Sequence, residues 1–122
     1  MILADSSVWI DHFRSPVREL QYAIEAGRLV VHRMLVGELA LGWLPDPANL
    51  LSLVRAMPMI DEVSDDDLLV FIERHQVISV GIGLVDAHFL ASVHATEGAK
   101  LWTRDKRLAS QAERLGLAYT AR

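Results

Sequence analysis

The first fourteen residues, MILADSSVWIDHFR (1–14), predict a short strand, a carboxylate and a helix, in that order. The apolar run 1–4 ends at Asp5, and the apolar residues of 6–14 recur at the spacing of one helical face. A strand that leads directly into a helix is the repeating unit of α/β proteins, whose strands pair in parallel. This segment therefore favours a parallel sheet with an acidic residue at the end of its first strand.

The rest of the chain continues this alternation. Strands are expected at 28–32, 58–63, 99–103 and 117–120, and helices at 34–44, 48–57, 64–76, 84–98 and 105–116. Ser64, followed three positions later by Asp67, has the pattern of a helix capping box. We expect an α/β fold in which a small, mainly parallel sheet is flanked by helices on both faces. We also expect residues 1–122 to form a single domain.

Composition narrows the classes of function. With 52% hydrophobic and 23% charged residues, the chain resembles an ordinary globular protein and not a disordered one. It has no cysteine, which excludes disulfides and thiolate metal sites. A net charge of −4 argues against binding nucleic acid by bulk positive charge, so a polyanion would need a cation or local basic residues. No apolar run is long enough to span a membrane, and we expect a cytoplasmic protein without a membrane partner.

Four acidic residues are placed where a parallel sheet brings side chains together. Asp5 and Asp105 follow predicted strands, Asp86 lies near the start of a helix, and Glu38 lies in the apolar stretch VGELAL. Ligands of open α/β sheets bind beyond the carboxyl ends of the strands, so these acids can converge there. For a lone Asp after a strand, a helix N-cap is the alternative interpretation, and Asp105 fits it well.

A cluster of these acids needs a counter-charge. At an effective dielectric near 20, two carboxylates about 4 Å apart repel by about 4 kcal/mol, so the cluster must be protonated or neutralised by a cation. A set of oxygen ligands selects Mg²⁺, with Mn²⁺ as the alternative ion. The chemistry that follows is metal-assisted hydrolysis of a phosphodiester.

Four segments resemble the PIN-domain family and, within it, the VapC-type ribonuclease toxins of VapBC toxin–antitoxin modules. They are ILADSSVWIDHFR (2–14), VGELALG (36–42), GIGLVDAHFLAS (81–92) and LWTRDKRL (101–108). Their order and spacing extend the resemblance over nearly the whole chain. The chain departs from many relatives before the glutamate, where they carry Ser or Thr and it has Met34 and Leu35, which offer no hydroxyl.

The resemblance implies a PIN-like fold and an acidic pocket that binds Mg²⁺ or Mn²⁺. It assigns Asp5, Glu38, Asp86 and Asp105 to catalysis and metal binding, with Ser6 and Thr103 as supporting hydroxyls. It also implies an endoribonuclease that cuts RNA of the transfer or ribosomal class, forms a homodimer and is neutralised by a VapB-like antitoxin. Operator DNA would be contacted only through that antitoxin.

Two other classes of protein remain as alternatives. One is a receiver-like signalling module that takes phosphate on an acid, although Asp5 is followed by serines where a receiver domain has further acids. The other is a catalytically silent PIN domain that acts only in an antitoxin–DNA repressor complex. None of the four acids is substituted, which favours an active nuclease.

Other residues are given more ordinary interpretations. Arg104 and Lys106 flank Asp105 and are expected to contact RNA phosphates. Gly81 and Gly83 are expected to form a turn between helices and not a dinucleotide-binding loop, because a third glycine is missing. Trp9, Trp43 and Trp102 are expected to serve core or dimer packing. The histidines are expected to be packing or surface residues, with His88 close enough to Asp86 to touch substrate: His12, His32, His75, His88 and His94.

Overall fold

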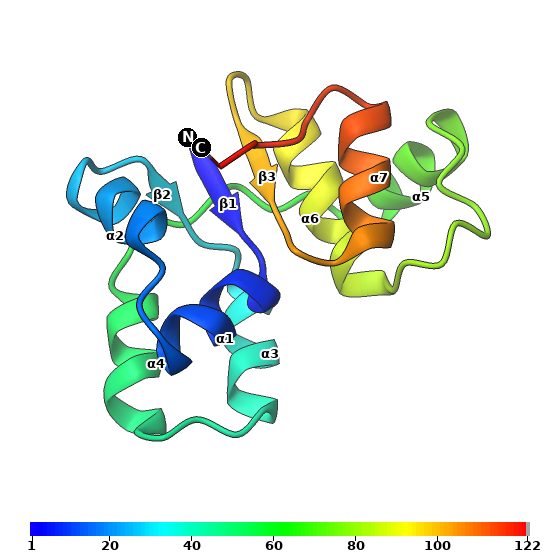
Figure 1. Cartoon of the computed structure of the whole chain (residues 1–122). Coiled ribbons are helices and arrows are strands. Elements are labelled where there is room, and N and C mark those ends of the chain that lie inside the picture. Colours follow the sequence, from blue (N-terminus) through cyan, green and yellow to red (C-terminus); the bar gives the residue numbers. More distant parts are fainter. Residues whose placement is uncertain (122) are drawn as a thin grey trace.

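The computed structural model describes residues 1–121. Its centre is a three-stranded parallel sheet in the order β2-β1-β3, formed by β1 (Ile2–Ala4), β2 (Leu29–Val30) and β3 (Lys100–Trp102) (Figure 1). In register, Leu3 lies opposite Val30 on one side and Leu101 on the other. β1 is buried throughout, as expected of the central strand of a covered parallel sheet. The predicted α/β fold class is confirmed.

The two remaining predicted strands are single bridges. Met59 pairs with Val31 beside β2, and Ala118 pairs with Leu101 beside β3. The predictions of full strands at 58–63 and 117–120 are therefore wrong in extent. Each bridge consists of two backbone hydrogen bonds. Val31 donates its amide to one residue of the segment 58–60 and accepts an amide from another, and Leu101 does the same with the segment 117–119.

Seven helices surround the sheet in the described part of the chain. They are α1 (Ser6–Arg14), α2 (Arg18–Glu25), α3 (Arg33–Leu41), α4 (Pro47–Arg55), α5 (Asp65–Arg74), α6 (Leu84–Ala95) and α7 (Lys106–Arg114). α2 was not expected from the sequence. Its N-cap, Val17, makes no side-chain capping bond, so the usual start signal is missing. The cap of α5 is as predicted, because the hydroxyl of Ser64 accepts a hydrogen bond from the Asp67 amide.

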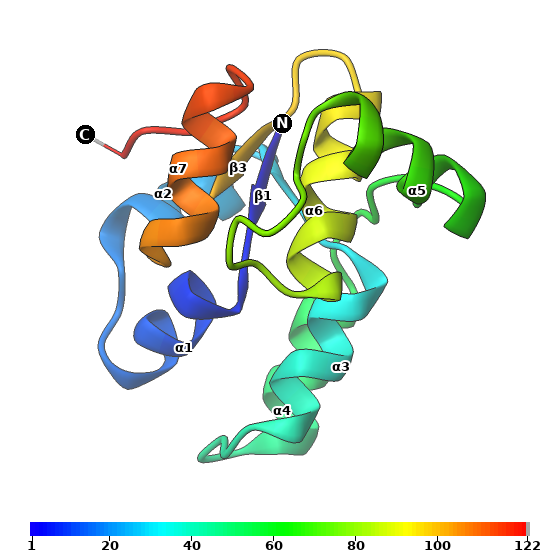
Figure 2. The same cartoon turned by 90° about the vertical axis from the view of Figure 1, so that its right-hand side faces the viewer.

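Helices cover both faces of the sheet. Figure 2 shows α2 and α7 on one side of the strands and α5 and α6 on the other. Between them lies one hydrophobic core, whose largest fully buried side chains include Trp9, Phe89 and Leu101. No helix among residues 1–121 is both long and apolar enough to cross a bilayer.

All three strands end at the same edge of the sheet because they run in parallel. α1 begins directly after β1, and α7 begins after the turn that follows β3 (Figure 1). The N-terminal ends of two helices therefore meet at this edge, and Asp5 and Asp105 are their N-cap residues. The topology thus places two of the four candidate acids at the carboxyl edge of the sheet.

Candidate active site

Asp5 is the most enclosed of the four acids, with 3% of its surface exposed. Its Oδ1 accepts hydrogen bonds from the Ser7 amide at 3.0 Å, the Ser7 hydroxyl and the Val8 amide at 3.4 Å. Its Oδ2 accepts a hydrogen bond from the hydroxyl of Thr103. Burial raises the pKa of Asp5, and these hydrogen bonds oppose the increase because they favour the charged form.

Asp105 serves the helix that follows it and also faces the site. Its Oδ1 accepts a hydrogen bond from the Leu108 amide at 3.0 Å, which caps α7. Its own amide donates to the hydroxyl of Thr103, which in turn donates to Asp5. The N-cap interpretation of Asp105 is thus correct, and it is compatible with a place in the acid cluster. The hydroxyl of Thr103 thus links the carboxylate of Asp5 to the backbone amide of Asp105.

Asp86 lies in the first turn of α6 and is partly buried. Its pKa is raised to about 6, first by burial and then by the negative charges of Asp5 and Asp105. An acid with this pKa is partly protonated at neutral pH, and such shifts are common at active sites. Burial is the main cause of this shift, and the two neighbouring carboxylates add to it.

Glu38 reaches the same region from the middle of α3. Burial raises its pKa, the charges of Asp86 and Asp5 raise it further, and the hydroxyl of Ser6 lowers it. The hydroxyl beside Glu38 therefore comes from α1 and not from its own helix. The Oε1 atom of Glu38 is buried without a hydrogen-bond partner in this structure, which is unfavourable for a polar atom.

The four acidic side chains offer oxygen atoms, which are the ligands that hard divalent cations prefer. Asp5, Asp86 and Asp105 interact electrostatically, as do Glu38, Asp86 and Asp5, and all their donor atoms are oxygens. A cation would relieve their mutual repulsion and satisfy the unpartnered oxygen of Glu38. Among residues 1–121, however, no three His, Cys, Asp or Glu side chains already converge as a ligand group. The cluster is an assembly of charges, not a closed metal cage.

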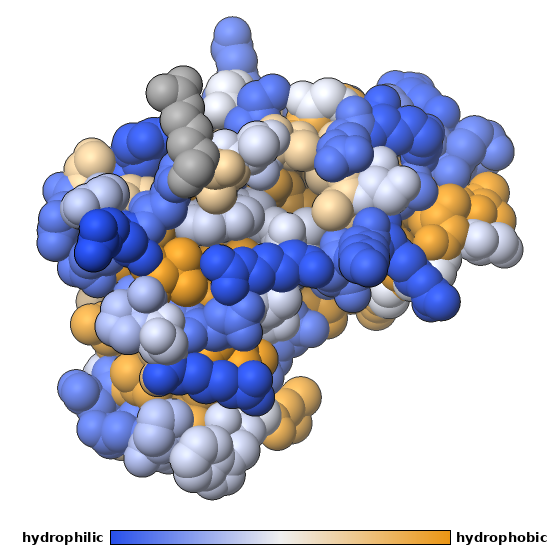
Figure 3. All heavy atoms as spheres, viewed as in Figure 1, coloured by the Kyte–Doolittle hydropathy of each residue, from blue (hydrophilic) through white to orange (hydrophobic). Residues whose placement is uncertain are grey.

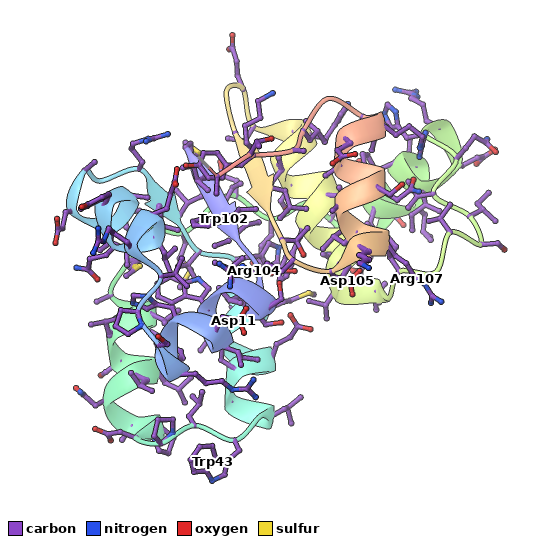
Figure 4. All side chains as sticks on the ribbon, in the orientation of Figure 1. Asp11, Trp43, Trp102, Arg104, Asp105 and Arg107 are labelled. Carbon is purple, nitrogen blue, oxygen red and sulfur yellow. The ribbon has the colours of Figure 1, made fainter. Side chains whose placement is uncertain are left out.

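The basic residues around Asp105 have distinct environments. The guanidinium of Arg104 pairs with Asp11 of α1, at 2.6 Å between Nη1 and Oδ2. Lys106 is exposed at the start of α7. Arg107 lies against the loop before α6, where a Cβ added to Gly81 would be 2.8 Å from its Cδ. Figure 4 shows Asp105 and Arg107 together at the beginning of α7 and Arg104 directed toward Asp11.

The surface beside these residues is concave. In the view of Figure 3, long hydrophilic side chains cross the middle of the face. The outline is hollowed between the part formed by α1, α3 and α4 and the part that carries α7. Asp105 and Arg107 lie beside this hollow (Figure 4). Asp105, the exposed acid of the four, is thus accessible from this side.

Two residues next to the acids were missed in the sequence. Ser7 donates to Asp5 through both its amide and its hydroxyl, and Asp11 holds Arg104. Ser7 had a recognisable signal, because the second residue after an N-cap commonly donates its amide to the cap side chain. Asp11 had none, because its partner is 93 residues away in the chain.

The histidines are packing, capping or surface residues in most cases. His32 is fully buried and caps α3 through Nδ1, which accepts from the Met34 amide at 3.0 Å. His75 and His94 contact Phe71 and each other with tilted rings, at the opposite end of α6 from Asp86. His88 is buried, and its Nδ1 has no partner in this structure.

Two of the three tryptophans lie in the core and the third lies at the surface. Trp9 and Trp102 are buried, as expected. Trp43 is 85% exposed, so of the expected core or dimer packing the core role is wrong for this residue. It follows the end of α3 and, with Phe13 and Arg14, lines a cavity of about 300 Å³.

Gly81 and Gly83 form a loop between α5 and α6, as predicted.

Comparison with known proteins agrees with this architecture. A family model described as the PIN domain matches residues 2–114. Ribonuclease VapC32, from two strains of Mycobacterium tuberculosis, is 36% identical to the chain over 118 residues. That alignment covers 97% of this chain and 95% of the relative. With strand-end acids on a parallel sheet and a match over almost its full length, the chain belongs to the PIN-domain family and is of the VapC type.

Proposed function

We propose that this protein is a divalent-metal-dependent endoribonuclease, the toxin of a type II toxin–antitoxin module. One observation carries the proposal: Asp5 and Asp105 cap two helices at the same edge of the sheet, and their charges act there on Asp86. A fold that assembles repelling carboxylates at one edge needs a cation to stabilise them. Membership of the PIN family and a relative named a ribonuclease support RNA as the substrate.

The four acids would hold Mg²⁺, or Mn²⁺ in its place. When bound, the ion supplies Lewis-acid stabilisation of the attacked phosphate and lowers the pKa of a coordinated water. Asp5, Asp86 and Asp105 would bind the ion, and the hydrogen bonds that Ser7 and Thr103 donate to Asp5 favour its charged form and orient it. Glu38, with one buried oxygen unpartnered, completes the site or orients the attacking water. Hydrolysis by this route leaves 5′-phosphate and 3′-hydroxyl ends.

The biological setting is also a proposal. We infer that the substrate is a transfer or ribosomal RNA, that the enzyme works in the cytoplasm as a homodimer, and that a VapB-like antitoxin neutralises it. Operator DNA would be contacted only through the antitoxin. The VapC name of the relative supports these assignments. Lys106, exposed next to Asp105, is the basic residue best placed to meet RNA phosphates.

The test is cleavage of a labelled RNA by the purified protein. We expect cleavage with Mg²⁺ or Mn²⁺, none with excess EDTA, and a loss of at least about 100-fold in Asp86→Asn. Asp66→Asn is the matched control, because Asp66 is an exposed acid in the first turn of α5. Cleavage that survives EDTA or Asp86→Asn would exclude the proposed mechanism.

The same assay separates the two alternatives. A catalytically silent PIN domain cleaves no RNA with any divalent ion, and its toxicity in cells survives Asp86→Asn. A receiver-like module incorporates phosphate stably on Asp5 from a small phosphodonor. The family match spans residues 2–114 as a PIN domain, which favours neither a receiver nor any other phospho-acceptor fold.

A further inference from the structure

An ion pair ties the middle of α1 to the turn between β3 and α7. Nη1 of Arg104 lies 2.6 Å from Oδ2 of Asp11, in a geometry that forms both a salt bridge and a hydrogen bond. Figure 4 shows these two side chains directed toward one another across the gap between the two elements. The pair therefore connects the element that begins at Asp5 with the turn that ends at Asp105.

Two further bonds join the same elements, and both involve groups bonded to Asp5. The amide of Arg104 donates to the hydroxyl of Ser7 at 2.9 Å, and that hydroxyl donates to Asp5. The hydroxyl of Thr103 donates to the other oxygen of Asp5. The turn and α1 are thus fastened at three points, and the Asp11–Arg104 pair is the outermost.

The position of the turn matters for the acid cluster. Asp105 lies directly after Arg104 in the chain, and its charge together with that of Asp5 acts on Asp86. A shift of the turn relative to α1 changes the separation between Asp5 and Asp105. Displacements of about 1 Å in a catalytic site can reduce rates by as much as about 100-fold.

We propose that Asp11 and Arg104 are positioning residues that set the separation of Asp5 and Asp105. The proposal rests on the proposed function of the same site. It also revises the role of Arg104: its guanidinium acts through Asp11 and does not bind an RNA phosphate. Arg104 is neutralised by a partner at 2.6 Å, whereas a phosphate would have to displace that carboxylate.

The pair is too exposed to serve mainly for stability. The side chains of Arg104 and Asp11 are 45% and 41% exposed, and exposed pairs contribute little to folding. Arg33 and Glu62 form a second exposed pair, at 3.3 Å, and neither of them is among the groups that shift the pKa of an acid in the cluster. Glu62→Gln is therefore a matched control that removes an exposed ion pair at a distance from the acids.

The experiment is a double-mutant cycle of Asp11→Asn and Arg104→Gln in the full-length protein. It measures kcat and KM on a labelled RNA, Mn²⁺ affinity by electron paramagnetic resonance, and the midpoint of urea unfolding. Each single variant should lower kcat about 10-fold or more, leave KM within twofold and weaken Mn²⁺ binding. The double variant should lose no more than the worse single variant, because both changes break one interaction. Unfolding midpoints and the Glu62→Gln control should match wild type.

Different outcomes would overturn the inference. If Arg104 binds RNA directly, Arg104→Gln raises KM, Asp11→Asn has no effect on kcat or on Mn²⁺ affinity, and the double variant behaves like Arg104→Gln alone. If the wild-type protein cleaves no RNA, the proposed function fails, but the Mn²⁺ measurement still decides the role of the pair. Unchanged Mn²⁺ affinity in both single variants excludes positioning of the acid cluster.

Discussion

At the scale of single residues, Asp86 is the side chain whose chemistry its surroundings change most. Its partial burial removes water from the carboxylate, and Asp5 and Asp105 add negative charge nearby, which together raise its pKa to about 6. The folded, metal-free protein therefore prefers Asp86 protonated in mildly acidic solution. A cation at the cluster reverses that preference, because it stabilises the charged form.

The first prediction concerns the stability of the metal-free protein against pH. Asp86 has a pKa of about 6 when folded and about 3.8 when unfolded, so between these values the folded state binds more protons. Stability contributed by this group is therefore present below about pH 4 and is lost as the pH rises through about 6. Asp86→Asn should weaken that decline and stabilise the protein at pH 7 by about 1–2 kcal/mol.

Urea unfolding in EDTA at pH 4 to 8 measures this effect. Asp66→Asn, which changes an exposed acid, should follow the wild-type curve. Asp5 and Glu38 also have raised pKa values, so part of the decline should remain in Asp86→Asn. A wild-type slope in that variant would show that Asp86 does not titrate near pH 6.

The second prediction concerns the hydroxyls that hold Asp5. Ser7→Ala and Thr103→Val each remove a donor to its buried carboxylate, so the charged form loses a partner. Each variant should lose about 1–3 kcal/mol of unfolding free energy at pH 7, and less at pH 5, because the pKa of Asp5 rises further. Urea titrations measure both values. Ser110→Ala and Thr120→Val, at exposed positions, should remain close to wild type.

At the scale of secondary structure, helix N-termini organise the site. α1 and α7 each begin with an aspartate whose oxygen accepts a backbone amide, at Asp5 and at Asp105. Capping fixes each carboxylate relative to its helix, and parallel strands bring both helix starts to one edge. One local interaction therefore serves folding and function together. α3 and α6 then bring Glu38 and Asp86 to the same place.

The third prediction contrasts two glycines. Gly81 has a φ of +81°, and a Cβ there would be 2.8 Å from the Cδ of Arg107. Gly81→Ala should destabilise the protein by about 1–2 kcal/mol and displace Arg107 from the loop before α6. Gly37 lies within α3 with nothing within 4 Å of an added Cβ, so Gly37→Ala should stabilise by about 0.5–1 kcal/mol.

Urea unfolding of the two variants side by side tests the contrast. The same chemical change is made at both sites, so side-chain hydrophobicity cannot explain opposite signs. Equal effects would show that the backbone at Gly81 is not held in the left-handed region. Loss of RNA cleavage in Gly81→Ala with unchanged stability would instead give Arg107 a role in the site.

At the scale of the whole molecule, two large apolar side chains near the end of α3 are exposed to solvent. Leu41 and Trp43, at and beyond the end of α3, are 91% and 85% exposed. Trp43 lines a cavity together with Phe13 and Arg14, whereas Trp9, whose ring lies 5.7 Å from that of Phe13, is fully buried in the core. The core and this exposed region thus place chemically similar residues in opposite environments.

The fourth prediction uses the contrast between two tryptophans. Trp9→Ala should cost about 3–5 kcal/mol because it empties a fully buried position, whereas Trp43→Ala should change stability by less than about 0.5 kcal/mol. Iodide should quench a large part of the wild-type tryptophan fluorescence and little of it in Trp43→Ala. Both unfolding curves should show one cooperative transition, as expected if residues 1–122 form a single domain. Two resolved transitions would contradict that domain assignment.

The sequence by itself determined the features that depend on neighbours in the chain. The strand–acid–helix segments at Asp5 and Asp105, the cap at Ser64 and the alternation that implies a parallel sheet were all readable, because periodicity and capping act over a few residues. The family resemblance then assigned all four acids, Glu38 and Asp86 included, to one metal-binding pocket. α2 was missed because it has no side-chain cap, and the outer strands were predicted too long because edge pairing depends on a neighbouring strand.

Only the tertiary structure decided which distant groups meet. It brought Glu38 and Asp86 under the influence of Asp5, paired Arg104 with Asp11, and left Trp43 in solvent. The apolar run around Trp43 is indistinguishable in sequence from one that is buried, because burial depends on what packs against it. Likewise, the sequence does not tell whether the guanidinium of Arg104 pairs with a phosphate or with a carboxylate, because the partner is distant in the chain. Local interactions thus made the acids predictable, and long-range packing determined their chemistry.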